Sequence, residues 1–68
     1  MRLTIETEQE RDGRWIAEIM EIPGALVYGT TRAEAIAVVQ ALALRVLADR
    51  LEADEDAGDL LSLEFVAA

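Results

Sequence analysis

The 68-residue sequence contains no cysteine and no histidine. Disulfide bonds are therefore impossible, and so is a zinc site built from cysteine and histidine ligands. The same absences remove the thiolate nucleophile and the imidazole base that many enzymes use. The only serine, Ser62, lies within an expected strand, where a structural role is the better interpretation. We expect no catalytic residue, no cofactor and no metal site.

Positive charge is also scarce, because six basic residues stand against 14 acidic ones and give a net charge of −8. All six are arginines, spread from Arg2 to Arg50 without a cluster. A nucleic-acid-binding surface must be basic enough to displace counterions from phosphates. We therefore expect no direct binding to DNA or RNA. An acidic surface either serves solubility or attracts a basic protein.

No apolar run approaches the roughly 20 residues needed to cross a bilayer, and no signal-peptide pattern precedes the first strand. We expect a cytoplasmic protein without a membrane partner, and one domain over residues 1–68. Domains of this size bury only about 60% of their unfolded surface. Since disulfides and Cys/His zinc sites are excluded, we expect stability to come from association, as a homo-oligomer (dimer or higher) or in a complex.

Three strands are predicted in the first half of the chain. Residues 2–8 and 14–20 alternate between apolar and polar side chains, as half-buried strands do, and residues 26–28 form a short third strand. Between the first two, Asp12–Gly13 supplies the positive φ values of a tight hairpin turn. Pro23–Gly24 predicts the second turn, because proline presets φ and glycine tolerates a positive φ.

A helix of about 20 residues is predicted from residue 32 to residue 51, a stretch without glycine or proline. Thr31 and Glu34 are spaced as a capping box at its start. One stripe should face the sheet: Ala35, Ile36, Val39, Leu42, Ala43, Val46 and Leu47. A second stripe is a candidate interface with another protein or a second copy, although the helix propensity of alanine also accounts for it. Its members are Ala33, Ala37, Ala41, Leu44 and Ala48.

The remaining chain is predicted to be an acidic loop over residues 52–59 and a fourth strand over residues 60–66. The fold class is then α+β, a two-layer β-β-β-α-β arrangement with one long helix packed on a four-stranded mixed sheet. A crossover through the helix should place the fourth strand parallel to the first.

The acidic residues do not match a calcium-binding loop and give little support for catalysis. Counted from Asp54, glycine falls at position 5 and Phe65 at position 12, whereas a calcium loop needs glycine at 6 and glutamate at 12. Paired carboxylates such as Glu6 and Glu8 could serve acid–base or two-metal chemistry. Exposed glutamates are common on strands, however, and we expect the protein not to be an enzyme.

Three segments, in this order, resemble the HicB-like antitoxin family: residues 12–18, 22–25 and 28–36. The match covers about residues 3–51. The residues that carry it are interpreted as fold-defining: Asp12, Gly13, Trp15, Ala17, Pro23, Gly24, Gly29, Thr31 and Glu34. The resemblance implies a partial RNase H-like fold of β-β-β-α-β order.

The resemblance also implies a function, that of an antitoxin which binds a small basic mRNA-cleaving toxin (HicA-like) and occludes its active surface. Many members continue into a DNA-binding domain, whereas this sequence ends at Ala68, so we expect no operator binding of that kind. The alternative is an orphan, self-associating domain with a ligand-binding or regulatory role and no toxin partner.

Overall fold

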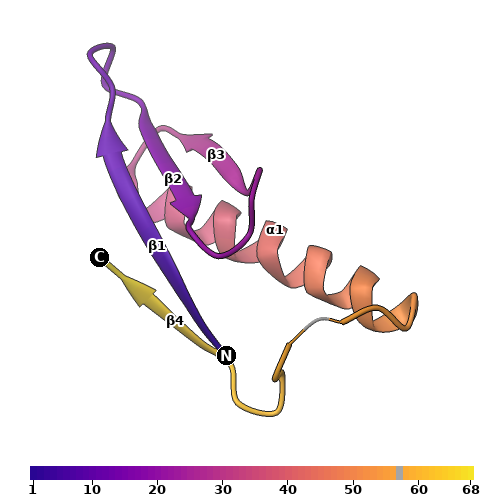
Figure 1. Cartoon of the computed structure of the whole chain (residues 1–68). Helices are drawn as coiled ribbons and strands as arrows, with labels where there is room; N and C mark the ends of the chain where they lie inside the picture. Colours follow the sequence, from indigo (N-terminus) through magenta and orange to yellow (C-terminus); the bar gives the residue numbers. More distant parts are fainter. Residues whose placement is uncertain (57) are drawn as a thin grey trace.

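The computed structural model describes residues 1–56 and 58–68. The elements follow the order β1 (Arg2–Gln9), β2 (Trp15–Ile19), β3 (Leu26–Gly29), α1 (Arg32–Glu52) and β4 (Glu64–Ala67). The sheet order is β3-β2-β1-β4, in which β4 runs parallel to β1 and the other pairs are antiparallel. The helix lies across one face of the sheet (Figure 1). The predicted α+β fold is thereby confirmed.

The hairpin between β1 and β2 closes differently from the expected tight turn. The Glu10 N–H donates to the Arg14 carbonyl at 2.7 Å, and the Gly13 N–H donates to the Glu10 carbonyl at 3.0 Å. Gly13 has a φ of +91°, but Asp12 has no positive φ. This pattern is a type I turn followed by a bulge glycine. The predicted hairpin is correct, and the predicted positive φ at Asp12 is wrong.

The turn between β2 and β3 is formed as predicted. The Ala25 N–H donates to the Ile22 carbonyl at 3.1 Å, which closes the turn around Pro23 and Gly24. Gly24 has a φ of +86°, the conformation that the third position of a type II turn requires. Glycine is therefore needed at position 24 for its backbone conformation.

The start of α1 contains one half of the expected capping box. The Glu34 N–H donates to the Thr31 hydroxyl oxygen at 3.0 Å, as predicted. The Glu34 carboxylate, however, accepts from the Thr30 hydroxyl at 2.8 Å and from the Thr30 N–H at 3.3 Å. It therefore fixes the residue before the N-cap, and the capping box in its full form is a correction to the sequence-based expectation.

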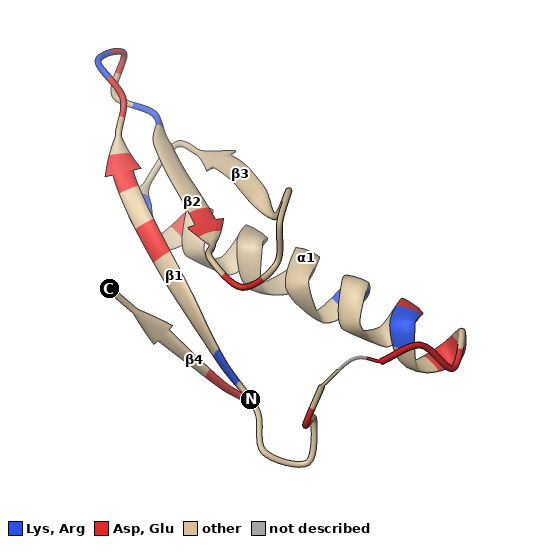
Figure 2. Ribbon diagram, viewed as in Figure 1, with Lys and Arg blue, Asp and Glu red and all other residues tan. Residues whose placement is uncertain are grey.

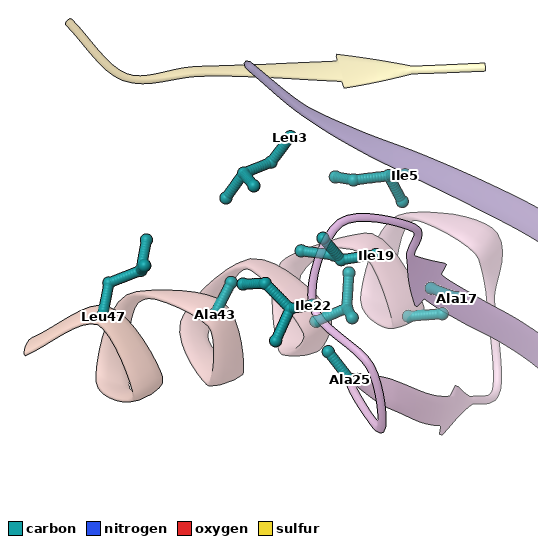
Figure 3. Packing of buried hydrophobic residues seen from close by; sticks show 10 residues of the cluster. Leu3, Ile5, Ala17, Ile19, Ile22, Ala25, Ala43 and Leu47 are labelled. Carbon is teal, nitrogen blue, oxygen red and sulfur yellow. The ribbon is translucent and has the colours of Figure 1, made fainter. Parts of the chain in front are cut away.

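The core lies between α1 and strands β1 to β3 (Figure 3). Its helical side chains are Ala35, Val39, Ala43 and Leu47, spaced four residues apart, and Ile36, Leu42 and Val46 pack at its border. This confirms the predicted sheet-facing stripe. The other buried side chains are Leu3, Ile5, Ala17, Ile19, Ile22 and Ala25. A core this small, with several alanines, requires the two layers to approach closely.

Gly29 is the position where that approach is tightest. A Cβ placed on Gly29 would lie 2.7 Å from the backbone nitrogen of Ala35 and 2.9 Å from its Cα. Both atoms belong to the first turn of α1 and cannot move without the helix. Glycine is needed here for space, because β3 and the helix start are in direct backbone contact.

The fourth strand begins later than predicted. β4 covers Glu64–Ala67, so the expected strand over residues 60–66 is wrong at its start. The ladder begins where the Glu64 N–H donates to the Met1 carbonyl at 2.9 Å. Residues before Glu64 pass the beginning of β1 and have no strand to pair with. Ser62 accordingly lies in a bend, where its carbonyl accepts from the amino terminus of Met1.

Replacing Gly29 by alanine should lower the free energy of unfolding by about 1–3 kcal/mol, the usual range for inserting a methyl group into a closed contact. Gly24→Ala is the matched control, since nothing lies within 4 Å of its Cβ position and only the φ is unfavourable. We expect a smaller loss there, of about 1 kcal/mol. Urea denaturation measures both, and equal losses would contradict the close-contact interpretation.

Candidate functional site

The sheet face opposite α1 is uncovered (Figure 1), and we call it the open face. Leu3 and Ile5 of β1 are buried under the helix, so the alternate residues of each strand point to the other side. By strand register the open face consists of Arg2, Thr4, Glu6, Glu8, Ile16, Glu18, Leu26, Tyr28, Glu64 and Val66.

Three glutamates occupy the centre of the open face. Glu6 of β1 lies directly opposite Glu18 of β2, and Glu8 follows on the same face of β1. Figure 2 shows these acidic positions side by side on the two strands. Like charges directly opposite each other on a sheet are destabilising. Because both carboxylates face solvent, the cost is modest, but the fold gains nothing from this pair.

No described arginine neutralises these three glutamates. The ion pairs within residues 1–56 and 58–68 join Arg2 to Glu64 at 2.9 Å and Arg14 to Asp12 at 2.8 Å. The Arg2–Glu64 pair is itself a cross-strand pair on the open face. The same face thus contains one neutralised position at its edge and an unneutralised acidic centre.

An apolar area adjoins the acidic centre. Ile16 pairs across the strands with Tyr28, and Leu26 lies next to it on β3. Leu26 is 43% exposed and Tyr28 48% exposed. The Arg14 guanidinium lies 4.7 Å from the centre of the Tyr28 ring. An exposed aromatic and aliphatic area beside charged groups is the composition typical of a protein-binding surface.

Arg14 is held in place by Asp12. The Asp12 carboxylate accepts from the Arg14 N–H at 3.0 Å and from its Nε at 2.8 Å. The backbone hydrogen bond from Arg14, supported by the guanidinium, lowers the pKa of Asp12 below its ordinary value. The hairpin therefore fixes the guanidinium over the ring of Tyr28, and this contact could not be read from the turn motif alone.

A second carboxylate, Glu21, joins β1 to the segment after β2. It accepts from the Thr4 N–H at 2.7 Å and from the Thr4 hydroxyl at 2.9 Å. The hydrogen bond from the Thr4 backbone, followed by that from its hydroxyl, lowers the pKa of Glu21. The carboxylate takes the place of a ladder partner beyond the end of β2. No local pattern predicts this contact, because 17 residues separate the two groups.

The acidic segment after α1 uses its carboxylates within the loop. Asp56 accepts from the Gly58 N–H at 2.9 Å, and Asp59 accepts from the Leu61 N–H at 3.2 Å. Residue 57 lies outside the described residues, so the predicted loop over residues 52–59 is described on both sides of it. Among the residues described, no group of three or more acidic side chains is arranged to hold a metal ion.

The other predicted residues lie where their motifs suggest. Trp15 and Ala17 of β2 face the helix, with Ala17 buried and Trp15 partly buried. The second helical stripe, Ala33, Ala37, Ala41, Leu44 and Ala48, is exposed along its whole length. It stays a candidate interface. Sequence analysis missed the open face as a unit, because its residues come from four strands and only the register brings them together.

Comparison with models of known protein families, with characterised proteins and with solved structures finds no match in any of the three. The resemblance to the HicB-like family therefore stays a prediction from the motif residues. No helix in the described part of the chain is long and apolar enough to cross a membrane.

The free energy of unfolding should decrease as the pH is lowered, because of Glu21. Because folding lowers the pKa of this carboxyl below 4.5, its contribution is complete above that pH and is lost as the pH falls through the lower, folded-state pKa. Glu21→Gln should therefore destabilise the fold at pH 7, and the difference from the wild type should shrink under strongly acidic conditions. Urea denaturation at pH 7 and under strongly acidic conditions tests this. A difference between the variant and the wild type that does not depend on pH would contradict it.

Relieving the acidic centre should stabilise the isolated chain. Glu18→Gln removes the charge opposite Glu6, and we expect a gain of about 0.2–1 kcal/mol in unfolding free energy. Glu64→Gln makes the same change in net charge on the same face but breaks the pair with Arg2. It should give no gain. Equal gains from both variants would mean that net charge alone, not the Glu6–Glu18 pair, is responsible.

Proposed function

We propose that this protein is an antitoxin of the HicB-like kind, which binds a small basic ribonuclease toxin through the open face and occludes the toxin's active surface. The observation that carries the proposal is the acidic centre of Glu6, Glu8 and Glu18, unneutralised within the described chain and placed beside exposed Leu26 and Tyr28.

Charge supports a basic partner. The chain has a net charge of −8, so a basic protein is attracted from a distance and an acidic one is repelled. Directly opposed residues of an antiparallel pair have Cα atoms about 5 Å apart, so one arginine or lysine of the partner can reach both Glu6 and Glu18. Binding then removes a repulsion that the free chain carries.

Size supports occlusion as the mechanism. A standard protein interface buries about 800 Å² on each partner, which is roughly a sixth of the 4557 Å² of accessible surface on this chain. One sheet face can supply that area. A basic ribonuclease binds the phosphates of its substrate through the same positive groups that an acidic face would cover. The antitoxin would thus compete with RNA for the toxin's positive groups and would also block access to them sterically.

The resemblance supplies the class of partner. The HicB-like segments fall on the hairpin, the Pro23–Gly24 turn and the start of α1, which together set the geometry of the three antiparallel strands. Glu6 and Glu8 of β1 precede the first of these segments, and Glu18 is the last residue of that segment without being one of its fold-defining positions. In this reading the motif residues build the scaffold and the glutamates make the contact.

The decisive experiment is capture of the partner from native lysate with the full chain as bait, followed by mass spectrometry and size-exclusion chromatography. We expect a stoichiometric complex with a small basic protein of below about 10 kDa, which is near the lower end of the size range of single domains. The isolated partner should cleave RNA, and adding this chain should stop the cleavage. A captured protein that stays active in the complex would contradict occlusion.

Charge-neutral variants locate the interface. The double variant Glu6→Gln/Glu18→Gln should weaken binding roughly a hundredfold, since two charge-assisted hydrogen bonds are lost, while the free chain becomes more stable. Glu52→Gln/Glu55→Gln changes the net charge equally, away from the open face, and should change affinity only a few-fold. Isothermal titration calorimetry compares them. Equal weakening by both variants would assign binding to net charge and not to the open face.

A further inference from the structure

Strand β4 is the least supported element of the fold. It pairs with β1 at the edge of the sheet, while α1 packs against β1, β2 and β3 (Figure 1). Parallel strands are normally covered on both faces, yet Val66 is 37% exposed. The β4 side of the sheet is therefore incompletely packed.

The outer edge of β4 presents free backbone groups. The Glu64 N–H donates to the Met1 carbonyl at 2.9 Å, and the Ala68 N–H donates to the Ile5 carbonyl at 2.8 Å. Backbone direction alternates along a strand, so the N–H and C=O groups of Phe65 and Ala67 point away from β1. Residues 65–67 have no charged side chain, no proline and no bulge in their register with β1, which are among the devices that protect an edge strand.

The opposite edge of the sheet is better closed. On β3 the Leu26 N–H already donates to the Gly24 carbonyl at 3.0 Å. The helix packs beneath this strand, and Arg14 covers the ring of Tyr28 on its other face. Both edges keep free backbone groups and exposed side chains, but β4 is the edge strand that α1 does not pack against.

We propose that two copies of this chain pair through their β4 strands, antiparallel and centred on Val66, to form one continuous sheet. In this register Phe65 lies opposite Ala67 of the second copy, and four backbone hydrogen bonds close the pairing. Val66 meets Val66 of the second copy, a β-branched pair that favours strand association. The large ring of Phe65 falls beside the small Ala67 on the helix side. The strand is thus complementary to itself.

Charge makes this edge accessible to a second copy of an acidic chain. Glu64 is the one charged residue of β4, and Arg2 neutralises it at 2.9 Å. In the proposed register each Glu64 lies opposite Ala68, four residues from Glu64 of the other copy. That separation is about 13 Å along the strand, beyond the Debye length of about 8 Å at physiological salt. Repulsion between the two Glu64 side chains is therefore small.

The test is the mass of the full chain in solution by light scattering after size exclusion, from micromolar to millimolar concentration. The wild type should reach twice the monomer mass of 7.5 kDa. Val66→Lys places like charges against each other across the two-fold axis and should remain monomeric. Tyr28→Lys makes the same charge change on the opposite edge strand and should still dimerise. A wild type that stays monomeric throughout, or a monomeric Tyr28→Lys beside a dimeric Val66→Lys, would overturn the proposal.

A second pair of variants tests the backbone directly. Ala67→Pro removes an N–H that points away from β1, so the monomer should keep its circular dichroism spectrum. The dimer loses two hydrogen bonds, and its dissociation constant should rise roughly thirtyfold or more. Ala67→Ser keeps the N–H and should dimerise like the wild type. Unchanged dimerisation of Ala67→Pro would exclude β4 pairing. The outcome is independent of the proposed function, because no toxin takes part.

Discussion

The fold depends on one close contact, where the start of α1 lies against β3 at Gly29 and Ala35. A helix of 21 residues is held on the sheet by side chains as small as Ala35 and Ala43, so the stabilising burial requires the two layers to be near each other. The absence of a side chain at Gly29 permits this. The contact also fixes where the helix lies, over β2 and β3, and therefore which parts of the sheet stay uncovered.

Two uncovered regions follow from having a single helix. The open face needs no apolar side chains for the core, so its composition is free to serve another purpose. At its edge the register places Arg2 against Glu64, which folding alone explains. At its centre the register places Glu6 against Glu18, which opposes folding. This unfavourable pair agrees with the binding role proposed for the open face, since departures from local folding rules are expected at functional surfaces.

Local sequence patterns predicted the helix and the strands, and the features that they did not predict depend on contacts between residues far apart in the sequence. The helix, its buried stripe and the positions of both turns are encoded within a few residues and were predicted, although the conformation of the first turn was not. The strand predicted from residue 60 begins at Glu64. Glu64 pairs with Arg2 and its N–H donates to the Met1 carbonyl, so the residues before Glu64 have no residue of β1 to pair with. The Glu34 carboxylate accepts hydrogen bonds from Thr30 and not from the N-cap residue, which the sequence spacing alone did not predict. The Glu21–Thr4 contact and the Glu6–Glu18 pair depend on strand register. The alternation of apolar and polar residues predicts which face of the sheet a side chain is on, but not which residue of the next strand lies opposite it.

The two proposed surfaces are compatible in space, and their arrangement has a consequence for affinity. Antiparallel pairing of two β4 edges relates the copies by a two-fold axis perpendicular to the sheet. Both open faces then lie on the same side of the continuous sheet and both helices on the other. A dimer would present two acidic centres to one surface, so a partner that is itself dimeric could engage both at once. The second contact becomes intramolecular, with an effective concentration in the millimolar range for closely spaced sites. Weak self-association of the chain would thus strengthen partner binding without any additional contact.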